Sequence, residues 1–285
     1  MNVTLRDGQP ADAPTIGRIC YDAFGAINAA HNFPPDFPHP DVAIGFLSMM
    51  LAQPGFYVVV AESDGRIIGS NGVDERSVVA GVGPITVDPA VQNSGAGRKL
   101  MQHVIDREAK RGCPSVRLVQ AAFHNRSLSL YTKLGFDPRE PLSCMQGAPL
   151  ALTLPGYKVR AAVAGDLSAC NRVCLNVHGH TRDGEVRDAI DSGSTTVVEH
   201  DGRITGYSTA LAFFGHSVGE TNNDLKALIA AAPAFGGPGF LLPTRNANLL
   251  RWCLNHGLRV VQPMTLMSIG LYNEPRGAFL PSIAY

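Results

Sequence analysis

The chain contains one recognisable segment twice. Val58–Val73 and Thr196–Leu211 each place the letters D-G-R-I-x-G after a run of apolar, β-branched residues. An Asp-Gly pair between two apolar segments is a strong signal for a β-hairpin with a tight turn. The chain is therefore predicted to contain the same hairpin twice, which constrains it to an internal repeat.

The similarity extends to both sides of these hairpins. Thr4–Ile16 resembles Lys158–Cys170, and each reads as a short strand, a polar turn and an amphipathic helix. Further along, a helix ends at Gly135 in the first copy and at Gly257 in the second, and an apolar residue follows each glycine. We therefore predict two similar domains in tandem. The two domains are expected to comprise residues 1–147 and 157–285. A linker rich in Pro and Gly, at residues 148–156, is expected to join them.

Composition limits the functional classes. The chain has 285 residues, 45% hydrophobic and 17% charged, with no net formal charge, which suits one or two globular domains. This neutral balance gives no reason to expect nucleic acid or an anionic membrane as a partner. No apolar run approaches the ~18 residues that span a bilayer, and the polar start "MNVTLRDGQPAD" is unlike a signal peptide. A cytoplasmic location is expected.

The cysteines and histidines predict no metal site. The six cysteines form no C-x-x-C pair, which is typical of free thiols in a reducing compartment. The "HGH" at residues 178–180 has no partner cluster with metal-ligand spacing.

A glycine-rich turn, "VDPAVQNSGAGRKL" at Val87–Leu100, precedes a predicted helix. The helix carries an apolar stripe of Leu100, Met101, Val104 and Ile105. Unpaired backbone N–H groups at a helix start bind phosphates. A Walker A loop does not fit because Leu100 follows Lys99, and a dinucleotide turn does not fit because Leu100 stands in place of its third glycine.

Two motifs in order carry a family resemblance. V-D-P-x-x-Q-x-x-G-x-G (Val87–Gly97) is followed, after a predicted strand, by N-x-x-x-x-x-Y-x-K-x-G-F (Asn125–Phe136). This arrangement resembles the GCN5-related N-acetyltransferase (GNAT) family, here as a tandem chain with a degenerate second copy. The resemblance implies an α/β fold in which each domain has a mixed, mostly antiparallel twisted sheet flanked by helices. It also implies acetyl-CoA as the cofactor.

The resemblance implies a set of coenzyme-binding residues. Gly95 and Gly97 lack a Cβ, so a pyrophosphate can approach the backbone closely, and the strand before the turn is implied to splay from its neighbour and pair with the pantetheine arm. The implied residues are Ile85, Thr86, Val87, Gln92, Asn93, Ser94, Gly95, Ala96, Gly97, Arg98, Asn125 and Tyr131. Asn125 is also expected to be the N-cap of its helix.

Tyr131 stands at the family position of the proton donor. A phenol with a pKa near ~10 can protonate a departing thiolate at neutral pH. The alternative is that Tyr131 only packs against the coenzyme. No covalent nucleophile is indicated, so direct acetyl transfer to an amine is expected.

The sequence does not single out a general base. The strand before the glycine turn has no carboxylate until Asp88, so Asp74 and Glu75 on the preceding strand are candidates, as are His31, His39 and His124. A water relay is equally compatible with the sequence, and so is a free amine substrate that needs no dedicated base.

The proline-rich loop "HNFPPDFPHP" at residues 31–40 is predicted to be stiff and non-helical. In the family this region borders the acceptor site, so His31, Phe33 and Phe37 are expected to line it, together with Asp74 or Glu75. The alternative is a loop that simply packs on its domain.

The second copy lacks the motif residues. Cys253 stands in place of Tyr131, Ala247 in place of Asn125, and Glu220 about where Gly95 stands. A carboxylate at a helix start would occupy the free N–H groups and repel a pyrophosphate, so the second domain is not expected to bind coenzyme A. Its role would be structural or substrate-shaping. The apolar tail after residue 270 is expected to close its sheet or to reach the substrate cleft of the first.

These features predict an acetyl-CoA-dependent N-acetyltransferase acting on a small-molecule or peptide amine. The chain is expected to be a monomer with pseudo-dimeric domains or a homodimer. The alternative function is a non-catalytic, coenzyme-A-responsive binding or regulatory protein.

Overall fold

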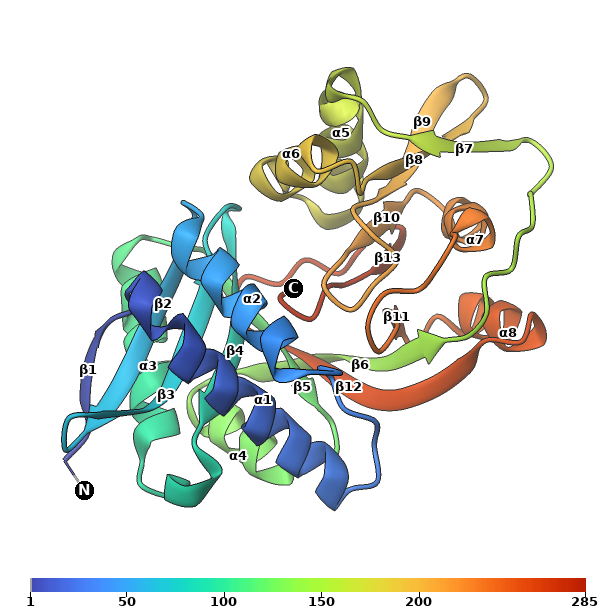
Figure 1. Cartoon of the computed structure of the whole chain (residues 1–285). Coiled ribbons are helices and arrows are strands. Elements are labelled where there is room, and N and C mark those ends of the chain that lie inside the picture. Colours follow the sequence, from blue (N-terminus) through green and yellow to red (C-terminus); the bar gives the residue numbers. More distant parts are fainter. Residues whose placement is uncertain (1) are drawn as a thin grey trace.

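The two halves of the chain repeat the same order of elements. The structure is a computed structural model that describes residues 2–285. Apart from an additional 3-10 turn before the third helix of the first half and a final short strand in the second, each half runs strand, 3-10 turn, two helices, three strands, helix, strand, helix, strand (Figure 1). The helices are α1 (Ala13–Ala30), α2 (Pro40–Ala52), α3 (Ala96–Lys110) and α4 (Asn125–Lys133) in the first half, and α5 (Leu167–His178), α6 (Asp183–Asp191), α7 (Asn222–Ala231) and α8 (Ala247–Asn255) in the second. The 3-10 turns are η1 (Pro10–Asp12), η2 (Pro89–Val91) and η3 (Ala164–Asp166).

The strands form two mostly antiparallel sheets. The larger sheet has the order β1 (Thr4–Asp7), β2 (Phe56–Ser63), β3 (Arg66–Asp74), β4 (Val79–Val87), β5 (Ser115–Ala121), β12 (Arg259–Gly270), β6 (Asp137–Gln146) and β11 (Phe240–Pro243). The smaller sheet has the order β13 (Ala278–Leu280), β10 (Ser217–Gly219), β9 (Arg203–Ser208), β8 (Thr196–His200) and β7 (Tyr157–Ala161). This is the mixed α/β architecture that the resemblance implied.

Both predicted hairpins are present. Asp64 and Gly65 have φ values of 51° and 74°, and Asp201 has 50°, so the turn residues adopt the left-handed conformations of a type I′ turn. The repeat also conserves an ion-pair arrangement. Arg6 donates to Asp12 at 2.7 Å, and in the second half Arg160 donates to Asp166 at 2.6 Å. The repeat therefore extends from backbone to side-chain contacts.

The two halves exchange strands. β12, from the second half, lies between β5 and β6 of the first, pairing Met267 with Leu118 on one side and Met264 with Leu142 on the other. β6 in turn pairs with β11 of the second half. The linker predicted at residues 148–156 separates the sequence repeats, but strands of both repeats share the larger sheet.

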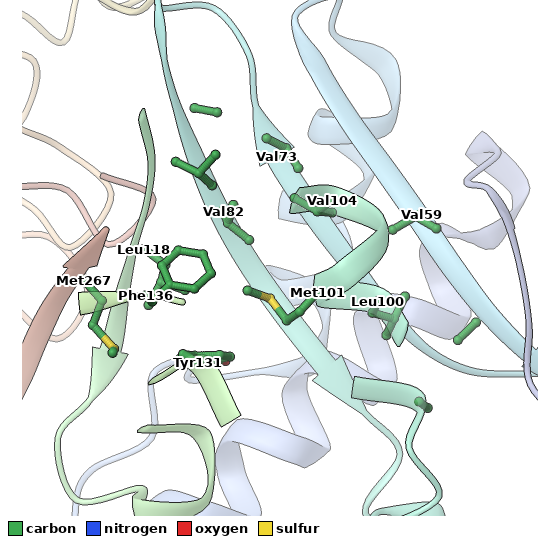
Figure 2. Close-up of a cluster of buried hydrophobic side chains, with 14 of the residues drawn as sticks. Val59, Val73, Val82, Leu100, Met101, Val104, Leu118, Tyr131, Phe136 and Met267 are labelled. Carbon is green, nitrogen blue, oxygen red and sulfur yellow. The ribbon is translucent and has the colours of Figure 1, made fainter. Parts of the chain in front are cut away.

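The larger sheet is packed on both faces. Successive residues of β2 point to opposite faces, so Val59 joins the core under α3 and α4 while Val58 joins the core under α1 and α2. Figure 2 shows the first of these cores, in which Met267 of β12 lies near Leu118 and Phe136 of the first half. The exchange therefore contributes buried side chains as well as backbone hydrogen bonds.

None of the helices within residues 2–285 combines the length and apolar character that crossing a membrane requires.

Candidate active site

Two neighbouring strands separate at the centre of the larger sheet. β4 and β5 pair in parallel only from Val79 to Gly81, opposite residues 115–117. A register shift between β3 and β4 marks a bulge opposite Gly72, which bends β4 away from β5. From Val82 onward β4 has no partner on the β5 side among the described strand pairs, so its backbone groups there face a wedge. The resemblance implied this splay.

The wedge opens into a cavity of about 800 Å³. All the residues predicted to contact the coenzyme line it, from the splayed strand, the glycine turn and α4: Ile85, Thr86, Val87, Gln92, Asn93, Ser94, Gly95, Ala96, Gly97, Arg98, Asn125 and Tyr131. Sequence-distant segments thus come together as the motif order indicated. Their roles as coenzyme contacts stay a prediction.

The glycine turn presents open backbone. Gly95 is the N-cap of α3 with φ 85°, a conformation that favours glycine. A Cβ at Gly95 would meet no atom within 4 Å, so the space beside the helix start is open there, whereas a Cβ at Gly97 would be in ordinary contact with Leu130 and Val87 at 3.8 Å. The first N–H groups of α3 can therefore bind an anion directly.

Arginine and lysine side chains surround this end of the cavity. Arg98 lines it, as do Arg126 and Lys133 of α4. Arg126 also donates to the side chain of Asn93 at 2.7 Å and to that of Gln92 at 3.3 Å, which ties α4 to the glycine turn. Sequence reasoning missed Arg126 and Lys133, although Lys133 is the lysine of the quoted motif.

Tyr131 lies at the junction of cavity and core. Only 8% of the residue is exposed, its ring lies 6.2 Å from that of Phe136, and it belongs to the cluster in Figure 2. Burial raises the pKa of Tyr131, which keeps the phenol protonated at neutral pH. The geometry accommodates both proton donation and packing.

The expected cap of α4 is wrong. His124, not Asn125, is the N-cap, and it carries no side-chain capping bond. Its carbonyl accepts from the N–H groups of Ser127 and Leu128. Asn125 is instead the first helical residue and lies in the cavity wall.

The carboxylates proposed as bases lie elsewhere. Asp74 accepts from Arg76 at 2.9 Å, and Glu75 accepts from Arg107 at 2.6 Å. Neither residue lines the cavity. Both are occupied by arginines at the end of β3.

Only part of the proline-rich loop lines the cavity. His31 and Phe33 pack on Phe123, with ring centroids 5.3 and 4.2 Å apart, and lie outside the cavity lining. Phe37 is buried and does line the cavity. His124 lines it too, and burial, followed by the charge of Arg126, lowers the pKa of its imidazole.

Sequence reasoning missed a second wall. Asp36, next to Phe37, lines the cavity and accepts from the Gln262 amide of β12 at 3.2 Å. Burial raises the pKa of Asp36, against the lowering effect of the Gln262 and Asn28 amides. The remaining members of this wall are aromatic or apolar: Phe24, Phe46, Phe213, Phe214, Met264, Ile283 and Ala284.

The C-terminal tail both pairs in the smaller sheet and extends to the cavity of the first half. β13 pairs with β10 and closes the smaller sheet. Ile283 and Ala284 then reach the cavity of the first half, and Figure 1 marks the C-terminus between the halves. The carbonyl oxygen of Ala284 lies so close to the backbone of Gly81 that a Cβ added to Gly81 would overlap this oxygen.

The counterpart helix start in the second half carries a carboxylate, though not the expected one. The carboxylate of Glu220 accepts a hydrogen bond from Arg203 at 2.6 Å. The N-cap of α7 is Thr221, whose N–H and hydroxyl both donate to Asp224 at 2.8 Å. The carboxylate at this helix start is therefore Asp224 rather than Glu220.

Among residues 2–285, no group of three or more His, Cys, Asp or Glu side chains is arranged to hold a metal ion.

Known proteins share this architecture. Residues 26–136 match the family model described as Acetyltransferase (GNAT) family. The chain is 42% identical over 53 residues to [Ribosomal protein bS18]-alanine N-acetyltransferase of Escherichia coli K12, a match that covers 19% of this chain and 36% of that protein. The chain thus spans about a third of the length of this curated relative.

Several solved structures match nearly the whole chain. A putative acetyltransferase from Pyrococcus horikoshii has a TM-score of 0.72 at 16% identity, covering 97% of this chain and 94% of that one. A tandem GNAT protein from the clavulanic acid biosynthesis pathway has a TM-score of 0.55 at 15% identity, covering 94% and 98%. The tandem fold is therefore shared along nearly the entire chain.

Proposed function

Since the first half of the chain belongs to the acetyltransferase (GNAT) family through residues 26–136, we propose that it is an acetyl-CoA-dependent N-acetyltransferase. The observation that carries this proposal is the wedge between β4 and β5, with the uncapped start of α3 at one end. The pantetheine arm would pair with the free backbone of Ile85–Val87. The pyrophosphate would lie on the N–H groups around Gly95–Arg98.

The charges of the cavity support this orientation. Arg98, Arg126 and Lys133 lie where the phosphates would bind. Asp36 lies in the second wall of the cavity, the acceptor wall, against which the acceptor amine would bind. An anionic coenzyme is attracted to the first group and repelled by the second. The thioester would then lie beyond Val82, facing the acceptor wall.

The reaction is direct transfer. The amine nitrogen attacks the thioester carbonyl, the new N–C bond forms, and the C–S bond breaks. The amine releases a proton, and the departing thiolate takes one from Tyr131, which is later reprotonated from solvent. The products are the amide, coenzyme A with a free thiol, and one proton for each ammonium consumed.

We propose that the second half binds no coenzyme and shapes the acceptor site instead. At the start of α7 the N-cap N–H of Thr221 donates to the Asp224 carboxylate, and this negative charge would repel a pyrophosphate. Phe213, Phe214 and the tail at Ile283 supply part of the cavity wall. This half would therefore select the acceptor without taking part in the chemistry.

Calorimetric titration with coenzyme A, followed by thiol release from acetyl-CoA with a panel of amines, tests the proposal. We expect one coenzyme bound per chain and amine-dependent thiol release, lost in Tyr131→Phe. Binding without release for any amine would instead identify a coenzyme-A-responsive binding protein. Two coenzymes per chain would refute the role given to the second half.

A further inference from the structure

The acceptor wall is a continuous cluster of phenylalanine rings contributed by both halves. Phe37 lies 6.2 Å from Phe24 of α1 and 6.4 Å from Phe214 of the loop between β9 and β10, measured between ring centroids. Phe214 lies 4.5 Å from Phe46 of α2 and 5.9 Å from Phe213. All of these rings line the cavity. The chamber therefore offers apolar, aromatic contact on more than one side.

One carboxylate lies in this wall. Among the described residues that line the cavity, Asp36 is the only Asp or Glu. It lies close enough to Cys20 of α1 and Cys144 of β6 to raise the pKa of both thiols, secondarily to their burial. This places the carboxylate where the α1–α2 layer meets the exchanged strands.

Asp36 has one amide hydrogen-bond partner but no cation. Gln262, itself 1% exposed, donates to it from β12. No Lys, Arg or His nitrogen within residues 2–285 forms an ion pair with it. A carboxylate in apolar surroundings without a countercharge is costly, and a bound ammonium would supply that charge.

We propose that the acceptor is a small primary monoamine with an aryl or bulky apolar body, and that Asp36 is the residue that selects its ammonium group. The inference rests on the proposed function and names the substrate class of the same cavity. The ring cluster would hold the apolar body and the carboxylate would fix the nitrogen toward the splayed strand.

The same wall disfavours other amines. A polyamine would bury further ammonium groups among phenyl rings with no second carboxylate to pair them. A peptide would place backbone N–H and C=O groups against those rings, leaving them without hydrogen bonds. An amino acid would bring its own carboxylate close to Asp36 when its ammonium group pairs there, and the two negative charges would repel each other.

The test measures binding to the complex of the full chain with coenzyme A. The ligands are 2-phenylethylamine, spermidine, an alanine-initiated tripeptide and the uncharged isostere 2-phenylethanol. We expect 2-phenylethylamine to bind at least tenfold more tightly than spermidine or the tripeptide. Asp36→Asn should weaken its binding about tenfold to a hundredfold, the loss of one charge-assisted contact, and leave 2-phenylethanol unchanged.

A matched control separates charge from folding. Asp41→Asn removes an exposed carboxylate in the first turn of α2 and should leave the affinities for 2-phenylethylamine and 2-phenylethanol unchanged. Phe214→Leu should weaken the binding of 2-phenylethylamine and of 2-phenylethanol equally, because it alters only the apolar wall. Preferential binding of spermidine or the tripeptide, or a phenylethylamine affinity that Asp36→Asn does not change, would overturn the inference. Because binding is the readout, absence of thiol release with every amine would count against the proposed reaction alone.

Discussion

Gly97→Ala should make the protein more stable while weakening its affinity for acetyl-CoA. Gly97 is in the first turn of α3 with ordinary helical geometry, and a Cβ there would have Leu130 and Val87 at 3.8 Å, which is normal contact. Alanine restricts the unfolded chain and favours the helix, so the free energy of unfolding should rise by about 0.5–1 kcal/mol. No neighbouring atom opposes the change.

The same methyl group would add to the cavity lining at the helix start, where the pyrophosphate is proposed to lie. Displacing the anion from one backbone N–H would cost about 1.5–3 kcal/mol, the value of a hydrogen bond to a charged group. That corresponds to a roughly tenfold to hundredfold weaker Kd. Titration calorimetry with acetyl-CoA measures the affinity, and urea unfolding without ligand measures the stability.

Gly45→Ala is the matched control. Gly45 is a glycine within α2, and a Cβ there meets no atom within 4 Å. It should gain similar stability with an unchanged Kd. A Gly97→Ala protein that is more stable and binds acetyl-CoA as tightly as the wild type would refute the assignment of the phosphate to the start of α3.

Other perturbations test the remaining features. Tyr131→Phe should lower kcat about 100-fold or more, as expected for loss of a general acid, and leave the Kd of acetyl-CoA within about twofold, by steady-state kinetics and calorimetry; an unchanged kcat would assign Tyr131 to packing alone. Burial lowers the pKa of His180 from 6.5 to about 4, so its stabilising effect is complete above pH 6.5 and is lost as the pH falls toward 4. His180→Gln should therefore flatten the pH dependence of unfolding in this window by up to about 1.4 kcal/mol per pH unit, and an equally steep profile would contradict this. Asp224→Ala should reduce the free energy of unfolding by about 1–3 kcal/mol through loss of the α7 cap without changing acetyl-CoA affinity; a weaker affinity would show that the second half influences the coenzyme site.

That the residues proposed to hold the coenzyme line one cavity could be predicted, because the parts of this wall are local. The left-handed position at Gly95, the start of α3 and the end of α4 at Gly135 each follow from a few neighbouring residues. Their order along the chain then places them at one end of one sheet. Only the cap of α4 was misplaced, by one residue, since His124 offers no capping side chain that could mark the boundary.

The acceptor wall could not be predicted because its contacts cross the molecule. Asp36 meets Gln262, and Phe46 meets Phe214, across separations that no local pattern encodes. The repeat suggested two closed domains, in which these residues would lie apart. The exchange of strands, which depends on the packing of the whole chain, brings them together. Asp74 and Glu75 are candidate bases by sequence alone, because their pairing with arginines depends on the folded arrangement of the side chains.

The position of β12 has a consequence for synthesis. The edge of β5 that pairs with Met264–Gly270 cannot form its hydrogen bonds until those residues have been synthesised. This happens long after the rest of the first half has emerged from the ribosome. Pairing between segments so distant in sequence is slow, because the loop between them must close first. During that interval β5 presents an unpaired strand edge, which is a template for pairing with other chains. The nascent protein should therefore depend on chaperones until β12 has been made, and truncation before Arg259 should yield aggregates rather than an active half.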